Sequence, residues 1–180
     1  MHESLRLIEP VEDLEIEFRR MAHESSKAEE GFAFDAAPQD FAAYLQFLRA
    51  QAAGLGLRPG EVPQTTFWLV NSNRRLLGLS RLRHWLTPAL EEYGGHIGYL
   101  IRPTERRKGF GTKILALTLE KASELALACV RLTCDTENIA SARIIERNGG
   151  VLSGYGVSPV NGKQTSQYWI QLGSARSWKV

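Results

Sequence analysis

Basic residues and glycines are concentrated between Arg102 and Thr112, where the sequence reads Arg-Pro-Thr-Glu-Arg-Arg-Lys-Gly-Phe-Gly-Thr. A predicted strand ends just before this segment, and a long predicted helix begins at its glycines. The first turn of a helix presents unpaired N–H groups, and glycine lets the backbone approach a ligand closely. With the formal charges of Arg106, Arg107 and Lys108, the segment predicts a pyrophosphate cradle. The alternative is a solvated basic turn that only starts a helix.

Other chemical motifs do not occur in the sequence. There is no Gly-x4-Gly-Lys-Ser/Thr loop, no three-glycine dinucleotide fingerprint and no Gly-x-Ser-x-Gly nucleophile elbow. The four histidines show no metal-ligand spacing, so no metal is expected. Cys129 and Cys134 fall at a helix end and within a strand, where buried thiols are common, so neither is expected to be catalytic.

Length and composition describe an ordinary globular chain. The 180 residues are 43% hydrophobic and 23% charged, values that predict one domain and argue against a disordered or collagenous chain. No apolar run approaches the roughly 18 residues of a membrane helix, and the N-terminus does not resemble a secretory signal. With only two cysteines, the sequence is typical of a reducing compartment. We therefore expect a cytoplasmic protein without a membrane partner.

The charge is distributed unevenly along the chain, although the net charge is only +2. Residues 1–40 hold 11 acidic and 4 basic side chains, whereas residues 41–180 hold 9 acidic and 18 basic ones. An acidic end and a basic body could bring a cation and an anion together. The alternative is that solvated helix faces near the start of the chain happen to be acidic.

Hydrophobic periodicity predicts hairpins first and then alternating strands and helices, which indicates a mixed sheet covered by helices. We expect an α/β (α+β) fold with a mixed, mostly antiparallel central sheet of about six to seven strands flanked by helices. The sequence favours strands at 5–8, 65–70, 76–85, 96–101, 130–134, 151–157 and 163–172, helices at 11–21, 109–128 and 138–148, a helix capped by Asp40, and loops at 31–38 and 88–95.

Two segments carry a family resemblance. The strand His96–Ile101, the run Arg106-Arg-Lys-Gly-Phe-Gly111 and the following helix resemble the acetyl-CoA motif of the GNAT N-acetyltransferase superfamily, Gln/Arg-x-x-Gly-x-Gly/Ala. Residues 138–150 resemble that family's next motif, in which an asparagine opens a helix that ends near a glycine. The resemblance implies a GNAT-like acyl-CoA-binding fold in a single domain over 1–180. Residues 1–60 would form variable substrate-side helices, and residues 65–172 the cofactor-binding core.

The resemblance also implies a reaction and a cofactor site. Acetyl-CoA would be the acyl-donor cosubstrate, and a primary amine would attack its thioester directly in a ternary complex, without a metal. Backbone groups of Tyr99, Leu100 and Ile101 would bind the pantetheine arm, and Asn138 would lie near it. The pyrophosphate would be held by Arg106, Arg107, Lys108, Gly109, Phe110, Gly111 and Thr112.

One position departs from the family pattern. Many relatives carry a tyrosine seven residues after the motif asparagine, where it protonates the CoA thiolate, and this chain has Ile145 there. Tyr155 and Tyr168 lie on the following predicted strands and could approach the same space, but the sequence favours a packed sheet residue at each position. We select Tyr168 as the candidate acid.

The general base has several candidates near the start of the motif strand. His96 opens that strand, and an unperturbed histidine is partly neutral at pH 7. Glu91 and Glu92 precede it, at about the level where relatives place a base. The alternatives are a structural histidine and exposed loop acids. We select His96 and Glu92 as the candidates.

Three function classes follow. The first is an N-acetyltransferase acting on a small-molecule or peptide amine. The second is a non-catalytic CoA-binding or regulatory module on the same fold, which Ile145 motivates. The third is nucleic-acid binding through residues 102–113, which the small net charge and the absence of a groove-reading motif argue against. A homodimer is compatible with the resemblance, and the identity of the amine is not encoded in any motif.

Overall fold

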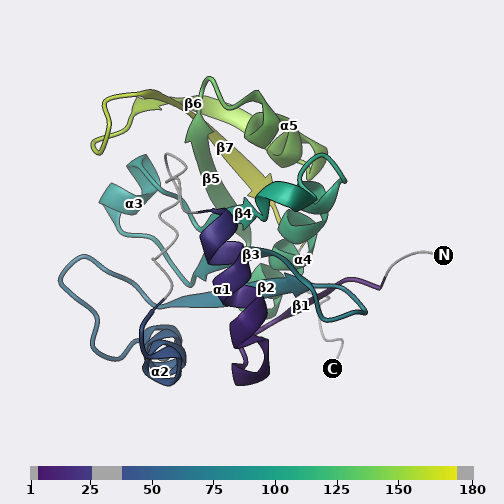
Figure 1. Ribbon diagram of the computed structural model, residues 1–180. Helices are drawn as coiled ribbons and strands as arrows, with labels where there is room; N and C mark the ends of the chain where they lie inside the picture. The colour runs from purple at the N-terminus through teal and green to yellow at the C-terminus, as the bar shows by residue number, and fades with distance from the viewer. Residues whose placement is uncertain (1–3, 26–37, 174–180) are drawn as a thin grey trace, which may run out of the picture.

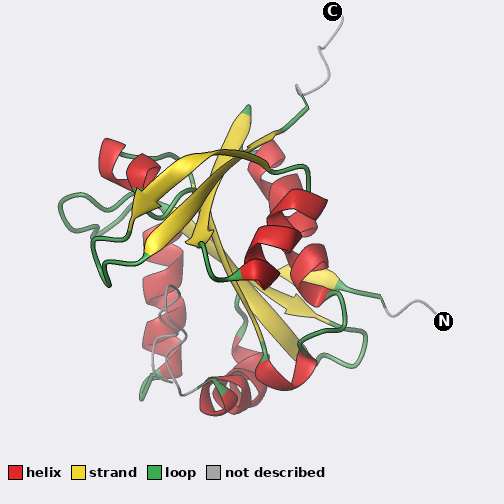
Figure 2. Cartoon of the chain, turned by 90° about the horizontal axis from the view of Figure 1, so that it is seen from above, coloured by secondary structure: helices red, strands yellow, loops and turns green. Residues whose placement is uncertain are grey.

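The computed structural model of the protein describes residues 4–25 and 38–173. Within these ranges seven strands form two antiparallel sheets, and the helices lie on both sides of the strands (Figures 1 and 2). The four-stranded sheet has the order β1-β2-β3-β4, and the three-stranded sheet has the order β5-β7-β6. The strands are β1 (Arg6–Ile8), β2 (Gln64–Val70), β3 (Leu76–Arg83), β4 (Ile97–Ile101), β5 (Cys129–Asp135), β6 (Val151–Val157) and β7 (Gln164–Gln171).

The helices are α1 (Glu15–Glu24), α2 (Phe41–Ala52), α3 (Pro88–Glu92), α4 (Phe110–Glu124) and α5 (Ile139–Arg147), with a 3-10 turn, η1 (Glu12–Leu14), before α1 and another, η2 (Pro103–Glu105), before α4. The expected α/β class is therefore confirmed, but the strands are divided between two sheets. Every strand pair within a sheet is antiparallel.

Each face of the sheets has its own hydrophobic core. On one face, Leu115 of α4 and Ile145 of α5 pack with side chains of both sheets, including Leu82 and Tyr168. On the other face, aromatic side chains of α1 and α2 cover the four-stranded sheet, and the Phe18 ring stacks on Trp68 at 5.3 Å between centroids. The apolar positions at helical spacing in the sequence are thus explained by two helical layers.

A buried ion cluster attaches α1 to the chain that follows β4. The Arg102 side chain is 2% exposed and donates hydrogen bonds to Glu17 Oε2 at 2.8 Å and to Glu24 Oε1 at 2.6 Å. Its Nη1 also donates to the Leu76 carbonyl at 3.2 Å, and the Thr104 hydroxyl donates to Glu24 Oε2 at 2.8 Å. Hydrogen bonding by Arg102 lowers the pKa of the Glu24 carboxyl below its ordinary value of 4.5. Two acids of the N-terminal segment are therefore paired inside the protein.

Several element boundaries differ from the sequence prediction. The segment 88–95, expected as loop, contains α3, because Thr87 caps it by accepting from Leu90 N and Pro88 suits the first helical position. The helix expected over 109–128 ends at Glu124, and Ala126 has a φ of 58°. The helix expected at 11–21 is η1 followed by α1, and Asp40 caps α2 as predicted. Residues 31–37 of the expected loop lie outside the described residues.

We expect Arg102→Met to lower the free energy of unfolding by about 2 to 3 kcal/mol at pH 7, because the half-buried carboxylates of Glu17 and Glu24 lose the buried guanidinium that they share. Urea denaturation measures this loss. The matched control is Arg74→Met, because Arg74 pairs with Asp13 on the exposed surface and should cost less than about 1 kcal/mol. Equal losses in the two variants would contradict the structural role of Arg102.

The difference in unfolding free energy between the parent and Arg102→Met should depend on pH. Because the pKa of Glu24 is lowered in the folded state from 4.5, this stabilisation is complete above pH 4.5 and is lost as the pH falls through the lower folded-state value. The difference in unfolding free energy between the parent and Arg102→Met should therefore shrink below that pH. A difference that grew on acidification would contradict the assignment.

Candidate active site

The two sheets meet at β4 and β5 but do not form a continuous ladder. In Figure 1 the strands β5, β6 and β7 lie above β1–β4, with β4 next to β5. Among the described residues, one isolated bridge, Gly95–Leu132, joins this pair. The His96 N–H donates to the Arg131 carbonyl at 2.7 Å beside the bridge. Beyond this point β4 has no ladder on the side of β5.

Hydrogen-bond alternation decides which backbone groups of β4 face this open side. The Arg102 N–H donates to a β3 carbonyl at 2.9 Å, and the His96 carbonyl accepts from a β3 amide at 2.8 Å. Because antiparallel pairing alternates, Leu100 also turns its backbone groups toward β3, opposite Leu79. Tyr99 and Ile101 therefore turn their backbone groups away from β3, toward the open side.

The start of α4 presents unpaired amides close to the end of β4. Gly109 is the N-cap residue, with a φ of 85° and no side-chain cap. The first bond into the helix runs from Lys113 N to Gly109 O at 3.2 Å. The N–H groups of Phe110, Gly111 and Thr112 are therefore outside the helical ladder and available to an acceptor. This is the arrangement that binds anions at helix N-termini.

The two glycines of this turn have different roles. A Cβ atom on Gly111 would lie 2.5 Å from Ile144 Cδ1 of α5, whereas a Cβ atom on Gly109 would meet nothing within 4 Å. Gly111 therefore allows α4 and α5 to pack closely, and Gly109 supplies the left-handed conformation of the turn. From the sequence alone, we expected both glycines to let the backbone approach a ligand closely.

The basic side chains of the turn are exposed but not all independent. Arg106 Nε donates to the Ile101 carbonyl at 3.3 Å, which is one of the groups on the open side of β4. Lys108 Nζ pairs with Glu105 at 2.8 Å, and Glu105 also pairs with Arg75 at 2.7 Å. Arg107 is exposed with a φ of 62°. The charge of Lys108 is therefore shared with Glu105.

Hydroxyl and thiol groups gather between β4, β5 and α5. The Tyr99 hydroxyl and Ser141 Oγ lie 3.0 Å apart, and burial raises the pKa of Tyr99 to about 12. Burial also raises the pKa of the Cys134 thiol to about 11, against the opposite effect of a hydrogen bond to Ser141. Asn138 caps α5 by accepting from Ser141 N at 3.0 Å. Ser141 is therefore hydrogen-bonded to a side chain of β4 and to one of β5, where the two strands separate.

Ile145 and Tyr168 belong to the core beneath this cluster. The Ile145 side chain is 1% exposed and packs in the same cluster as Tyr168, which is 3% exposed. Burial, with smaller effects of Cys134 and Glu146, raises the pKa of Tyr168. Tyr155 is exposed on the edge strand β6. Of the two candidate tyrosines, only Tyr168 shares the buried environment of Ile145.

His96 is held by the strands on both sides. Its Nδ1 accepts from the Arg131 N–H at 2.9 Å, and the residue is 7% exposed. Burial, and then the charge of Arg83, lowers the pKa of His96 to about 4. The ring is therefore neutral at pH 7, with its proton on Nε2 and its acceptor nitrogen engaged. This bonding favours a structural role for His96.

The two acidic candidates lie at the end of α3. Glu91 and Glu92 are both exposed. The Glu92 carbonyl accepts from Gln167 Nε2 at 3.0 Å, which joins α3 to the three-stranded sheet. Among the described residues the Glu92 carboxylate forms no ion pair.

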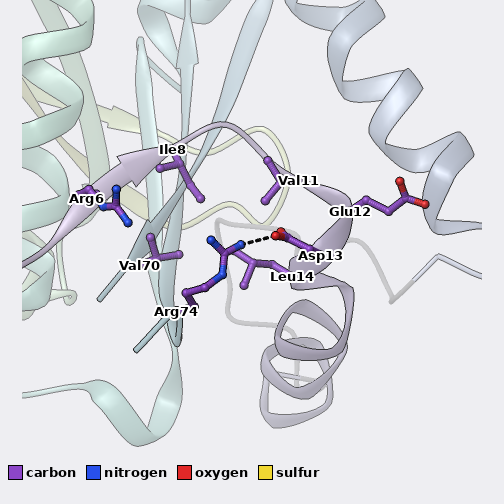
Figure 3. A pocket seen from close by; sticks show the side chains of 8 residues that line it. All are labelled: Arg6, Ile8, Val11, Glu12, Asp13, Leu14, Val70 and Arg74. Atoms are coloured by element: carbon purple, nitrogen blue, oxygen red, sulfur yellow. Dashed lines mark hydrogen bonds and ion pairs between the residues drawn. The ribbon is translucent and has the colours of Figure 1, made fainter. Parts of the chain in front are cut away.

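A separate hollow of about 440 Å³ lies where β1, η1 and the β2–β3 turn meet (Figure 3). Arg74 and Asp13 form an ion pair across it at 2.6 Å, as Figure 3 shows. No residue predicted for the site lines it. In the part of the chain that the structure describes, there is no cluster of three metal-ligating side chains and no helix long and apolar enough to cross a membrane.

A family model for the acetyltransferase (GNAT) domain matches residues 5–151. The chain belongs to the GNAT acetyltransferase family. The match runs from β1 to the start of β6, so it includes both the open edge of β4 and the start of α4. The family predicted from the motifs at 96–111 and 138–150 is therefore confirmed.

Solved structures share the fold of this GNAT domain at low sequence identity. A candidate acetyltransferase, yncA of Salmonella typhimurium with its cofactor acetyl-CoA, is 12% identical, with 98% of each chain covered and a TM-score of 0.67. A chimera of the spermidine N-acetyltransferase SpeG of Vibrio cholerae and hSSAT is 17% identical, with 95% of this chain and 96% of that chain covered and a TM-score of 0.62. An acetyltransferase of the GNAT family from Streptococcus pneumoniae is 15% identical, with 94% and 100% covered and a TM-score of 0.66. No curated protein sequence matches the chain.

Ser141 belongs to this site, but no motif in the sequence of the GNAT domain points to it. Its position three residues after the capping Asn138 places it in the first turn of α5, but only the fold brings it to Tyr99. The residues predicted to bind the cofactor on β4 and at the start of α4 do not all face the same side. Tyr99, Ile101 and Arg106–Thr112 lie along the open edge and the α4 turn, whereas Leu100 faces β3.

We expect the His96 imidazole to remain neutral down to about pH 5, with the proton on Nε2, because burial lowers its pKa to about 4. Nitrogen-15 NMR of the imidazole, assigned with His96→Gln, measures both the pKa and the tautomer. A pKa near 6.5, or a proton on Nδ1, would contradict the bond from Arg131.

Proposed function

We propose that the protein transfers an acetyl group from acetyl-CoA to a primary amine, by direct attack in a ternary complex. The observation that carries this proposal is the alignment of two backbone surfaces that lie outside the strand and helix ladders of the described residues. The open edge of β4 at Tyr99 and Ile101 leads to the uncapped start of α4 at Gly109. An extended ligand with amides at one end and a diphosphate at the other complements both surfaces.

The cofactor would lie along these surfaces with its pyrophosphate at α4. The amides of Gly109–Thr112 would hold the phosphates, and Arg106 and Arg107 would add charge. Lys108 would contribute less, because it is shared with Glu105. Tyr99 and Ile101 would bind the pantetheine amides through their backbone groups, and Leu100 would hold β4 to β3. Asn138 would orient the first turn of α5 beside the same arm.

The reaction needs a neutral amine, a stabilised oxyanion and a proton for the thiolate. The amine nitrogen bonds to the thioester carbon, the carbon–sulfur bond then breaks, and the CoA thiolate takes a proton. We assign the proton to the Ser141 hydroxyl, which is bonded to Tyr99 and connects both strands. Tyr168 is the second candidate, because its hydroxyl shares the neighbourhood of Cys134.

Of the two base candidates, Glu92 is the more available. The acceptor nitrogen of His96 is bonded to Arg131, whereas the Glu92 carboxylate is exposed. The amine would lose its proton to Glu92 through water. Binding both substrates together supplies the proximity that the attack requires, without a covalent enzyme intermediate.

The cradle is tested by substitution at Gly109, where asparagine and aspartate both tolerate a positive φ. We expect Gly109→Asp to bind acetyl-CoA at least about ten-fold more weakly than Gly109→Asn, because only the first adds a negative charge beside the diphosphate. Isothermal titration calorimetry measures the difference. Arg106→Gln should weaken binding in the same direction. If all three variants bind like the parent, the cradle is elsewhere.

The proton donor is tested with Ser141→Ala and Tyr168→Phe. If Ser141 protonates the thiolate, Ser141→Ala should lower kcat by about 100-fold with little change in the KM for acetyl-CoA, while Tyr168→Phe keeps most of its activity. Thiol release with a panel of amines measures both. The reverse pattern would assign the proton to Tyr168, and full activity in both variants would contradict both assignments.

The second candidate function is a CoA-binding module without catalysis. The observation that favours it is Ile145, a buried side chain that can donate no proton. Acetyl-CoA binding without thiol release from any amine in the panel would favour this module, and turnover would exclude it.

A further inference from the structure

Three arginines, two on β3 and one on β5, project onto the face opposite α4. On β3, Ser80 Oγ lies 2.8 Å from Thr118 of α4, so the odd-numbered side chains Arg81 and Arg83 lie on the other face. On β5, Val130 and Leu132 belong to the α4 core, so Arg131 also lies on the other face. This face is the one that α1 and α2 partly cover.

His96 holds Arg83 and Arg131 together at the closed end of the β4–β5 junction. Its carbonyl accepts from the Arg83 N–H at 2.8 Å. Its own N–H and Nδ1 bond the backbone of Arg131 at 2.7 and 2.9 Å. The Arg131 guanidinium lies over the Trp169 ring, with Cζ 5.2 Å from the centroid. We call Arg83, His96, Arg131 and Trp169 the junction cluster.

The side chains of the junction cluster are bonded to neutral groups. Arg83 Nη1 donates to the Gly95 carbonyl at 2.7 Å, and Arg131 Nη2 donates to Gln167 Oε1 at 2.6 Å. Among residues 4–25 and 38–173, neither arginine forms an ion pair with a carboxylate. Burial, and then the charge of Arg81, lowers the pKa of Arg83. Within the described residues, the cluster therefore carries positive charge that no carboxylate compensates.

Unsatisfied polar atoms lie on the same face. Arg131 Nε is buried without a hydrogen-bond partner in the described structure, and so are the hydroxyls of Thr66 and Thr165, which are 3% and 2% exposed. Thr66 is opposite Arg81 in the β2–β3 ladder, and Thr165 lies two residues from Gln167 on the same side of β7. Buried polar groups normally have partners, so these atoms leave hydrogen-bonding capacity unused on this face in the described structure.

We propose that the junction cluster binds a carboxylate of the acetyl acceptor, so that the acceptor is an amine that also carries a carboxylate. This inference rests on the proposed acetyl transfer. His96 lies three residues before Tyr99 on β4, about 10 Å away along the strand. One acceptor molecule of that length spans the cluster and the thioester. An arginine fork provides the parallel donors that a carboxylate accepts.

The uneven charge along the sequence left open a cation bound by the acidic N-terminal segment. Of the acids described in that segment, Glu17 and Glu24 are hydrogen-bonded to Arg102, and Glu15 is hydrogen-bonded to Arg19. Their charge is largely compensated by neighbours within the fold. Among the described residues, Arg83 and Arg131 on the face opposite α4 have no carboxylate partner, so under this proposal they favour an anionic group.

The binding experiment uses two probes of equal length and opposite charge. The full chain is titrated with glutarate, a dicarboxylate, and with 1,5-diaminopentane, a dication, with and without saturating CoA. Calorimetry gives the affinity, and the fluorescence change that is lost in Trp169→Phe places the probe at the cluster. The test variant is Arg131→Gln, and the matched control is Arg143→Gln, because Arg143 is exposed on α5.

We expect glutarate to bind the parent and Arg143→Gln alike and to bind Arg131→Gln at least about ten-fold more weakly. Diaminopentane should not compete. The inference is overturned if glutarate binds under neither condition, if diaminopentane binds as well, or if Arg131→Gln keeps the full affinity. Should Arg131→Gln not fold, the comparison of the two probes on the parent decides.

Acetyl-CoA calorimetry on the same preparation separates this inference from the proposed function. Acetyl-CoA binding without glutarate binding contradicts only the carboxylate site. Glutarate binding without acetyl-CoA binding contradicts the proposed transfer and leaves an anion site at the junction. Acetylation of 5-aminopentanoate in preference to diaminopentane would support both together.

Discussion

The interruption of backbone pairing between β4 and β5 is the constraint on which the rest of this structure depends. A strand inside a folded protein normally satisfies its backbone groups on both sides. Here one bridge closes the junction, and Tyr99 and Ile101 then turn their N–H and C=O groups toward a strand that has moved away. The Ile101 carbonyl accepts from Arg106 Nε at 3.3 Å, and under the proposed function an extended amide-containing ligand would pair with the rest of this edge. We therefore propose the open edge of β4 as a binding surface that requires no side-chain motif.

The surrounding elements keep this junction open and in place. Gly111 lets α5 approach α4, which sets the helical layer over one face, and Gly109 turns the chain into α4 beside the end of β4. On the other face, Arg102 attaches α1 directly after β4 through Glu17 and Glu24. Strand β4 is thus held at its C-terminal end by Arg102 and along one edge by β3, while the edge toward β5 has no ladder in the described residues. Rigid flanking elements position the reacting groups in this way.

Charge in this domain has two separate uses. Most acids of α1 compensate arginines within the protein, so they stabilise the fold and contribute little to the field outside. Arg83 and Arg131 have neutral partners among the described residues, so their charge remains available at the junction. A count of charges along the chain cannot separate these cases, because the sequence does not show whether a charged residue forms an ion pair in the fold.

The sequence by itself determined the family, the α/β class and the position of the α4 turn, because glycines, basic residues and hydrophobic periods act locally. It also located the cap at Asn138 and the loss of a tyrosine at Ile145. Only the tertiary structure divided the strands into two sheets, engaged the acceptor nitrogen of His96 and joined Ser141 to Tyr99. These features depend on contacts between residues tens of positions apart, and spacing along a chain does not encode which distant strands pair or where a ladder stops.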